Sequence, residues 1–412
     1  MNTRAPGPRI AVIGGGWAGI AAAVDLAAAG VAVTLYEAGR APGGRARGVD
    51  IAGRRVDNGQ HILLGAYRET LALMRRIGAD PERLLARYPF RVVNNAAFRL
   101  ALPRLPAPLH VAWGLLAARG VGWREKLSAA RWIKRLKQDH FRLADDGSVA
   151  AWLDAAGQTG VLRRQLWEPL CLAALNTPVA EASAQLFANV LRDSLGSPRR
   201  ADTDLLLPRV DLSRLLPEPA SDWLAARGAD LRLSTRVRAL DLDADAVRVD
   251  GETYAAAILA TAPRHAARLW PALGGMFADQ PIATLYLQYP ASVRLPFALQ
   301  KLDGPLGQWV VDRGNGLLAC ILSGHGGWEE VDDETLTQRL AAELALGQPG
   351  WRQIIRERRA TFSATPNLPR PAPSLAPHLF LAGDYTWAEY PATLEGAVRS
   401  GRRAAELALA AA

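Results

Sequence analysis

The segment Arg9-Ile10-Ala11-Val12-Ile13-Gly14-Gly15-Gly16-Trp17-Ala18-Gly19 decides the fold of this 412-residue chain. An apolar strand runs directly into a Gly-x-Gly-x-x-Gly turn. Gly14 permits the tight turn that leaves the strand, Gly16 lets backbone amides approach a diphosphate, and Gly19 lets the next helix pack closely on the sheet. The start of that helix adds the positive end of its dipole. The segment therefore predicts a dinucleotide-binding βαβ unit.

The next strand supports this prediction. The apolar run Val31-Ala32-Val33-Thr34-Leu35-Tyr36 ends at Glu37, where a carboxylate can accept hydrogen bonds from an adenosine ribose. Residues 10–36 carry a single charge, Asp25, and are long and apolar enough to resemble a membrane span. The glycine spacing and the change of period from strand to helix favour a buried βαβ unit instead.

A second part of the predicted cofactor site lies near the other end of the chain. The stretch His378-Leu379-Phe380-Leu381-Ala382-Gly383-Asp384 is typical of a strand that ends in a binding loop, and Leu394-Glu395-Gly396-Ala397 follows as a helix start. A protein that carries part of one site near each end of its sequence must fold the chain between them around the cofactor. We therefore expect one large enzyme rather than a small nucleotide-binding module.

Composition narrows the class of protein. Half of the residues are apolar, so the chain can bury a large core, and we expect two intertwined domains. Cys171 and Cys320 are the only cysteines, and we find no export signal, which favours a reducing, cytoplasmic location. The six histidines include no pair at metal-ligand spacing, so we expect no metal site.

The formal net charge of +9 is concentrated in one region. No nucleic-acid motif is present, so the excess of bases between residues 119 and 142 favours an anionic membrane surface, at the inner face of the cytoplasmic membrane. Trp113, Trp123 and Trp132 lie among the bases and suit a bilayer interface, with packing in a helical core as the alternative. The bases are Arg119, Arg124, Lys126, Arg131, Lys134, Arg135, Lys137 and Arg142.

The order of the expected elements indicates an α/β protein, in which a Rossmann-like cofactor-binding domain is interleaved with a mixed α+β substrate-binding domain. We assign residues 1–70, 200–265 and 376–412 to the first domain, and 71–199 and 266–375 to the second. Residues 67–195 are expected to be mainly helical and to include the basic helical segment 110–142. Strands are expected at 231–233, within 237–249, and at 256–262, 283–288, 317–322 and 379–382.

Longer motifs resemble a known family. Glu37 followed by Arg40-Ala41-Pro42-Gly43-Gly44-Arg45 resembles the second fingerprint of the flavin amine oxidase and phytoene desaturase superfamily. Carotene desaturases carry segments similar to 57–67, 382–386 and 394–401. The chain resembles the bacterial squalene-associated branch, the hydroxysqualene dehydroxylases, more closely still. Four segments carry this resemblance: Gln60-His61, Leu166-Trp167-Glu168-Pro169-Leu170, Leu175-Asn176-Thr177-Pro178 and Leu205-Leu206-Leu207-Pro208-Arg209.

The resemblance implies FAD as the cofactor, bound tightly without a covalent link. Arg45 would donate to the diphosphate or its ribose, Val237 would meet the adenine through its backbone, and Asp384 would hold the ribityl chain. The amides of residues 395–397, at a helix start, would stabilise negative charge on the reduced ring. The expected cofactor-binding residues are Gly14, Gly16, Gly19, Glu37, Arg45, Gln60, Val237, Gly383, Asp384, Glu395, Gly396 and Ala397.

The resemblance also implies a reaction, the removal of a hydroxyl group from hydroxysqualene by reduced FAD to give squalene, in squalene and hopanoid synthesis. Loss of water from an allylic alcohol leaves a delocalised cation that accepts hydride, and a dry cavity prevents its recapture by water. The step needs a proton donor, and His61 is the first candidate. Alternatively, His61 and Gln60 only orient the ring or a nearby water. Tyr385 and Glu168 are further candidates, and each could equally be a hydrogen-bonded structural group.

Two other classes of function stay open on this resemblance. A carotene desaturase would oxidise a polyene and pass electrons to a quinone-type acceptor, and a carrier like the Rab GDP-dissociation inhibitors would bind a prenyl lipid without catalysis. The complete motif at 394–397 argues against a carrier. An amine oxidase is disfavoured because Pro391 and Ala392 stand where its aromatic pair is sought. Residue chemistry alone decides neither between reductase and desaturase nor which donor reduces the flavin.

Overall fold

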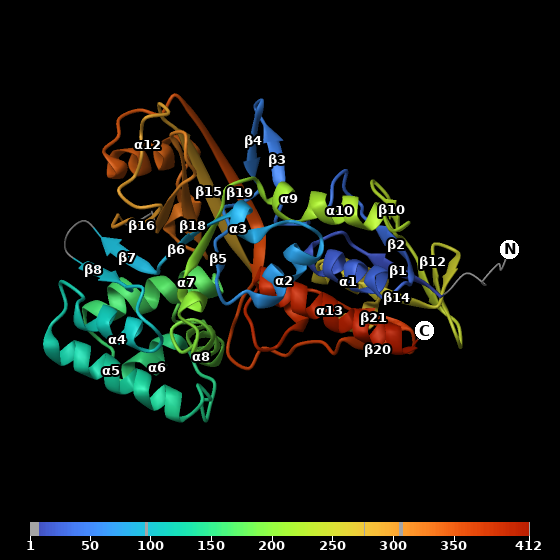
Figure 1. Cartoon of the computed structure of the whole chain (residues 1–412), viewed down its shortest axis with the longest axis horizontal. Helices are drawn as coiled ribbons and strands as arrows, with labels where there is room; N and C mark the ends of the chain where they lie inside the picture. Colours follow the sequence, from blue (N-terminus) through green and yellow to red (C-terminus); the bar gives the residue numbers. More distant parts are fainter. Residues whose placement is uncertain (1–7, 95–97, 276, 305–307, 412) are drawn as a thin grey trace.

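The computed structural model describes residues 8–94, 98–275, 277–304 and 308–411, and a six-stranded sheet forms the right half of the molecule in Figure 1. Its strands follow the order β10-β2-β1-β14-β21-β20, and all neighbours are parallel except β20 and β21. The strands are β1 (Arg9–Ile13), β2 (Ala32–Tyr36), β10 (Asp230–Arg232), β14 (Ala256–Leu259), β20 (Ser374–Ala376) and β21 (Leu379–Leu381). The predicted strand pair around the glycine turn is therefore confirmed, and β14 and β21 join it from distant parts of the sequence.

Helices α1 (Trp17–Ala28) and α13 (Leu394–Ala411) lie side by side, the first in blue and the last in red in Figure 1. Gly401 permits this close packing, because a Cβ atom there would lie 2.0 Å from the carbonyl oxygen of Ala18 in α1. Gly19 faces the sheet side of α1 instead, since a Cβ atom on it would lie 1.9 Å from the carbonyl oxygen of Gly14 in the turn after β1. A glycine at position 19 therefore lets α1 start close to the sheet.

A five-stranded antiparallel sheet, β16-β17-β18-β15-β19, forms the upper left part of the molecule (Figure 1). Helix α12 (Asp333–Leu344) covers one face through Leu336 and Leu340, and the other face joins the main core through Tyr286 and Ile321. Because both faces are covered, β15 is buried along most of its length. The strands are β15 (Asp279–Gln288), β16 (Leu299–Lys301), β17 (Trp309–Asp312), β18 (Leu317–Ser323) and β19 (Trp351–Phe362).

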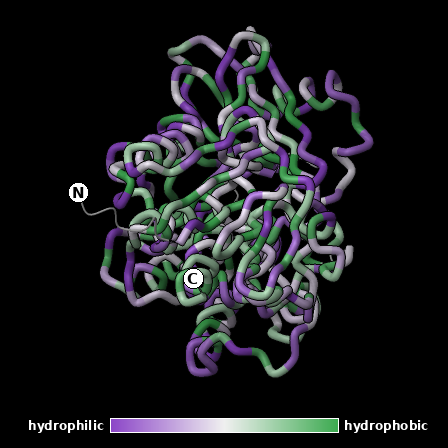
Figure 2. The backbone as a smooth tube through the Cα atoms, turned by 90° about the vertical axis from the view of Figure 1, so that its right-hand side faces the viewer, coloured by the Kyte–Doolittle hydropathy of each residue, from purple (hydrophilic) through white to green (hydrophobic). Residues whose placement is uncertain are grey.

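A group of helices forms the lower left of Figure 1 and packs around Trp132, Trp152 and Trp167, whose rings meet edge to face. Figure 2 shows the strongly hydrophilic segments mainly at the periphery of the whole chain. The helices on this side are α4 (Leu109–Leu116), α5 (Trp123–Gln138), α6 (Val149–Ala155), α7 (Glu168–Leu175) and α8 (Ala184–Asp193).

Smaller elements connect these layers. Their helices are α2 (Arg68–Arg76), α3 (Pro81–Leu84), α9 (Leu212–Leu215), α10 (Pro217–Ala225) and α11 (Pro263–Leu269). Their strands are β3 (Gly48–Ile51), β4 (Arg54–Asp57), β5 (Leu63–Leu64), β6 (Leu85–Tyr88), β7 (Arg91–Asn94), β8 (Phe98–Ala101), β9 (Leu205–Pro208), β11 (Leu240–Leu242), β12 (Val247–Val249) and β13 (Glu252–Tyr254).

Residues 67–195 are mainly helical, as expected, but they also contain the strands β6, β7 and β8, which were not predicted. The strands expected within 237–249 are β11 and β12, which form a separate antiparallel sheet with β13. For Trp132 the expectation of a surface position is wrong and the alternative of core packing holds, because its ring is buried against Trp152 and Trp167. The assignment of residues to the two domains stays a proposal.

Candidate active site

A cavity of about 990 Å³ extends from the glycine turn to the five-stranded sheet and the helical side of the protein. Its walls include the carboxyl ends of β1, β2 and β14, the loop after β4, and the first turn of α13. The carboxyl edge of a parallel sheet is where ligands of such folds bind. Most of the predicted site residues, from both ends of the sequence, line this one cavity.

The glycine turn leaves room for a ligand. A Cβ atom on Gly16 would meet no atom of the described residues within 4 Å apart from its chain neighbours, so this side of the turn faces open space. Gly14 is different, because its φ is +112° and a Cβ there would lie 2.6 Å from the carbonyl oxygen of Ala260. Gly14 thus shapes the turn while Gly16 leaves the space that a diphosphate would fill, as the spacing predicts.

Glu37 and Val237 border the end of the cavity expected to hold the adenosine. The Glu37 carboxylate accepts hydrogen bonds from the amides of Gly15 (2.8 Å) and Gly39 (2.6 Å), so it fixes the turn as well as offering its remaining lone pairs to ribose hydroxyls. Among the described residues, the backbone amide of Val237 has no hydrogen-bond partner. A free amide on the cavity wall fits the backbone contact with adenine that the resemblance implies.

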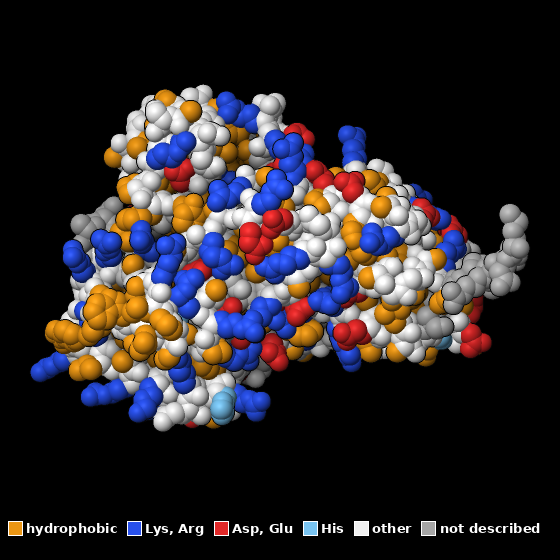
Figure 3. All heavy atoms as spheres, in the orientation of Figure 1, with side chains coloured by type: hydrophobic (Ala, Val, Ile, Leu, Met, Phe, Trp, Pro, Cys, Tyr) orange, Lys and Arg blue, Asp and Glu red, His pale blue; other side chains and the backbone are white. Residues whose placement is uncertain are grey.

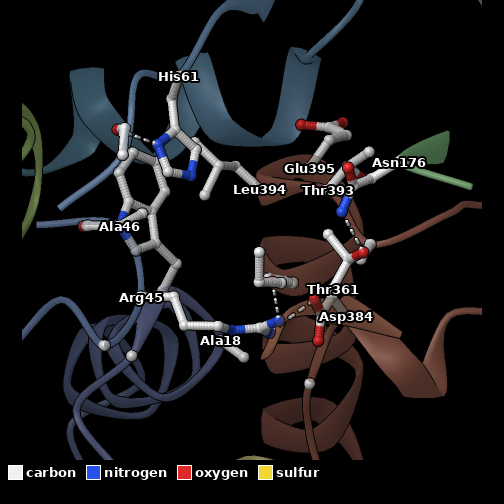
Figure 4. A pocket seen from close by; sticks show the side chains of 18 of the residues that line it. Ala18, Arg45, Ala46, His61, Asn176, Thr361, Asp384, Thr393, Leu394 and Glu395 are labelled. Atoms are coloured by element: carbon white, nitrogen blue, oxygen red, sulfur yellow. Dashed lines mark hydrogen bonds and ion pairs between the residues drawn. The ribbon is translucent and has the colours of Figure 1, made fainter. Parts of the chain in front are cut away.

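Arg45 and Asp384 meet directly in the cavity (Figure 4). Nη2 of Arg45 lies 2.6 Å from Oδ2 of Asp384, and its Nη1 donates to the carbonyl oxygen of Ala360 at 2.6 Å. The negative charge of Asp384 raises the pKa of Arg45. The Gly383 amide donates to Oγ of Ser400 (2.9 Å), which anchors this loop on α13. Sequence reasoning gave the two charged residues separate roles, whereas the structure joins them as one ion pair.

The start of α13 differs in detail from expectation. The amides of Gly396 and Ala397 bond to Oγ1 and the carbonyl oxygen of Thr393, at 3.0 Å each, so they are not free to face a ring. Among the described residues, the amides of Leu394 and Glu395 have no hydrogen-bond partner, and both residues line the cavity. The helix N-terminus at the cavity is therefore present, and of the three amides predicted to be free there, only that of Glu395 is free, together with that of Leu394.

Glu395 has a role that its sequence position did not reveal. Its carboxylate accepts hydrogen bonds from the amides of Glu69 (3.1 Å) and Thr70 (3.0 Å), and it pairs with Arg399. Glu69 and Thr70 begin α2, so Glu395 caps the N-terminus of a second helix. A cap supplied from more than 300 residues away carries no local sequence signal.

His61 points into the cavity, on the side facing Leu394 (Figure 4). Its Nδ1 lies 2.8 Å from the carbonyl oxygen of Gly59. Because a carbonyl only accepts, Nδ1 carries the proton of the neutral ring and Nε2 is an acceptor. Burial, aided by the charge of Arg45, lowers the pKa of His61. Gln60 supports this segment, since it donates to the carbonyl oxygen of His61 (2.8 Å) and accepts from Arg313 (3.2 Å).

The other two predicted proton donors are already engaged. Tyr385 lines the cavity, but its hydroxyl donates to the carbonyl oxygen of Thr261 at 3.1 Å, and burial raises its pKa. Glu168 is not among the residues that line the cavity, because its carboxylate pairs with Arg163 at 2.7 Å on the helical side. The structure therefore does not bring Glu168 to the candidate site.

Comparison with known proteins agrees with this cavity. The model of the flavin containing amine oxidoreductase family matches residues 17–409. Hydroxysqualene dehydroxylase from Rhodopseudomonas palustris is 36% identical, with 97% of this chain and 98% of the relative covered. A probable zeta-carotene desaturase from Synechococcus elongatus is 26% identical, with 98% and 99% covered. Among solved structures, a putrescine oxidase triple mutant superposes with a TM-score of 0.73 at 18% identity, covering 98% and 99%.

The fold, the cavity and the family match define the class: the chain is an FAD-dependent oxidoreductase of the flavin containing amine oxidoreductase family. Within that class it belongs to the hydroxysqualene dehydroxylase family, since a full-length relative of that family exceeds 30% identity. The residues of the cavity fit the cofactor, because Gly16 leaves open space and the amides of Val237, Leu394 and Glu395 have no hydrogen-bond partner within the described parts of the chain.

Proposed function

We propose that this protein converts hydroxysqualene into squalene by reductive dehydroxylation. The observation that supports this most is the 36% identity to a hydroxysqualene dehydroxylase along the full length of both chains. Zeta-carotene desaturases are more distant, at 26% identity or less, so desaturation is the weaker alternative. The reaction removes the hydroxyl oxygen as water and consumes two electrons and two protons.

FAD, when bound and reduced, supplies the hydride for this reaction. The protein supplies the surroundings. Leu170, Leu205, Trp309 and Ile321 line the same cavity as His61, so a long isoprenoid chain can be held there with little water. His61 is the proposed proton donor to the departing hydroxyl group, and it must first gain a proton at Nε2 because its neutral ring offers only an acceptor there.

Anaerobic incubation with two substrates tests this proposal. Protein whose FAD has been chemically reduced should yield squalene from hydroxysqualene while the flavin absorbance returns to that of the oxidised form. Protein with oxidised FAD should leave phytoene unchanged. Desaturation of phytoene with reduction of the flavin, together with no squalene from hydroxysqualene, would favour the desaturase alternative.

We further propose that the protein acts as a peripheral protein at an anionic membrane, at the inner face of the cytoplasmic membrane. Among the described residues, no helix is long and apolar enough to span a bilayer. Helices α4 and α5 instead expose large apolar side chains, with Trp123 exposed by 63%, Leu109 by 58% and Trp113 by 55%. Figure 3 shows these hydrophobic atoms gathered at the lower left and bordered by Lys and Arg side chains.

This apolar patch comprises Leu105, Leu109, Trp113, Leu116, Trp123 and Leu127. Exposed apolar patches bordered by polar residues mark membrane or protein interaction sites. The Lys and Arg side chains that border the patch favour a membrane over a protein partner, because they attract anionic lipid headgroups and Trp side chains suit the membrane–water interface. Nζ of Lys126 lies 5.0 Å from the Trp123 ring centre, which joins both features in one pair. A membrane surface also holds the water-insoluble substrate.

A further inference from the structure

Within the part of the chain that the structure describes, four tyrosines line the cavity, and the hydroxyl groups of three of them are hydrogen-bonded to protein. Tyr36 shares a hydrogen bond with Tyr254 (2.7 Å), Tyr385 donates to the carbonyl oxygen of Thr261 (3.1 Å), and Tyr390 donates to Asp193 (2.6 Å). The hydroxyl of the fourth, Tyr67, has no hydrogen-bond partner among the described residues. The Tyr67 hydroxyl oxygen is also not completely enclosed by protein atoms. Tyr67 thus offers a free hydroxyl to the cavity.

The position of Tyr67 is fixed by the backbone around it. Its amide donates to the carbonyl oxygen of Leu64 (3.0 Å), and its own carbonyl oxygen accepts from Leu71 in α2 (3.0 Å). The amides of Glu69 and Thr70, in the first turn of α2, are held by Glu395. Tyr67 is therefore anchored beside the first turn of α13, where the two free amides lie.

His61 borders the same part of the cavity. It lies six residues before Tyr67, on the other side of β5, and its side chain points toward Leu394 at the start of α13 (Figure 4). The segment from His61 to Tyr67 thus presents two polar groups to the cavity beside the start of α13. Polar groups placed in this way orient a ligand by its few polar atoms.

We propose that Tyr67 binds the substrate's hydroxyl group, by donating its phenolic hydrogen to the oxygen that is removed. This inference rests on the proposed function and deepens it, because it names the residue that distinguishes the alcohol substrate from its hydrocarbon product. Burial and the nearby charge of Glu395 raise the pKa of the Tyr67 phenol, so Tyr67 stays a protonated donor across the pH range in which enzymes work. The same hydrogen bond stabilises negative charge on the departing oxygen.

The Tyr67→Phe variant tests this role, because it removes only a hydroxyl that forms no hydrogen bond with a described protein group. The oxidised protein cannot turn over, so binding of hydroxysqualene and of squalene is followed by the change in flavin absorbance on titration. Wild type should bind hydroxysqualene about ten-fold more tightly than squalene, as one hydrogen bond allows. Tyr67→Phe should lose that preference, keep its affinity for squalene, and slow the single-turnover dehydroxylation roughly 10- to 100-fold.

Two further variants sharpen the test. Tyr289→Phe is the matched control, because the Tyr289 hydroxyl bonds to the carbonyl oxygen of Gly347 outside the cavity (3.3 Å), and it should change neither affinity. Ser323→Ala removes another cavity hydroxyl without a described partner, on the five-stranded sheet. A loss of preference in Ser323→Ala but not in Tyr67→Phe would overturn the assignment to Tyr67.

The outcomes separate this inference from the proposed function. Equal affinity of wild type for hydroxysqualene and squalene would overturn the inference without the use of any variant. An equal loss of both affinities in Tyr67→Phe would mean that Tyr67 only packs. If reduced wild type forms no squalene at all, the proposed function fails and the inference fails with it, whereas normal turnover with an unchanged Tyr67→Phe contradicts the inference alone.

Discussion

At the residue scale, Gly16 and Gly14 illustrate two uses of one residue type. The Gly16→Val side chain would project into open space, so we expect a folded protein that does not retain FAD, because the side chain fills the room for the diphosphate. Absorbance of the purified protein measures FAD content. Gly147→Val is the matched control, since a Cβ there also meets nothing within 4 Å but lies away from the cavity. Full FAD occupancy in Gly16→Val would contradict the assignment.

His61 gives a prediction about pH. Its pKa is lowered from 6.5, so near neutral pH a smaller fraction is protonated than for an ordinary histidine. A proton donor must be protonated, so single-turnover dehydroxylation should accelerate as pH falls through 6.5 and level off only below the lowered pKa. Rapid mixing of reduced enzyme with hydroxysqualene at several pH values measures this dependence.

Removal of the imidazole is the companion experiment. His61→Ala should slow the same step by about 10²- to 10⁴-fold and abolish its pH dependence, with FAD content and chemical reduction of the flavin unchanged. Near-normal single-turnover rates in this variant would assign His61 to structure alone. A rate in wild type that falls with acidity would instead indicate that His61 works as an acceptor through Nε2.

Sequence reasoning at this scale found which residues gather, but not how they pair. The family resemblance implied that Arg45, Asp384 and His61 surround one cofactor site, and all three line the cavity. The Arg45–Asp384 ion pair and the tautomer of His61 depend on contacts between distant segments. Tyr67 belongs to the segment 57–67 that resembles carotene desaturases, but no feature of the sequence assigned it a role. The structure does so, because its hydroxyl has no hydrogen-bond partner among the described residues.

At the element scale, the contact between α13 and α2 should contribute strongly to stability. Glu395 is 1% exposed and serves the first amides of α2 as well as Arg399. Glu395→Ala should lower the free energy of unfolding by roughly 2–4 kcal/mol, because buried amides and a partly buried guanidinium lose a charged partner. Glu406→Ala, on the exposed face of α13, should change it by less than about 0.5 kcal/mol. Denaturant unfolding compares the two, and equal effects would contradict this account.

The predicted elements succeed where the local pattern is strong. The βαβ unit, β15 and β18 have long apolar runs, and the structure confirms strands there. Strand β19 was missed because charged residues interrupt it, at Arg352, Arg356 and Arg358. Its pairing with β15 over most of its length overrides that pattern, which only the three-dimensional neighbour makes visible.

At the scale of the whole molecule, the apolar patch and its basic border predict binding to anionic membranes. Each base near the surface contributes about 1 kcal/mol, so replacement of Arg131, Lys134, Arg135 and Lys137 by Gln should weaken binding to anionic liposomes and leave FAD content intact. Sedimentation with vesicles measures the effect. Replacement of Trp113 and Trp123 by Ser should weaken binding even at high salt, because that part is apolar.

A charge-matched control separates the effect of the four bases on α5 from the effect of the net charge of the protein. The exposed bases Arg83, Arg294, Arg339 and Arg358 lie outside α4 and α5, and their replacement by Gln removes the same charge. This control should bind anionic liposomes as wild type does. Equal sedimentation of wild type with neutral and anionic vesicles would refute the electrostatic part of the proposal.

The central claim is that the cavity assembled from both ends of the chain reduces an allylic alcohol, and anaerobic single turnover tests it most directly. Protein with reduced FAD and no further donor is mixed with excess hydroxysqualene, and product and flavin absorbance are followed together. The account predicts one squalene formed for each FAD that becomes oxidised, and none from protein that starts oxidised. Flavin that stays reduced while hydroxysqualene is recovered unchanged would contradict the claim.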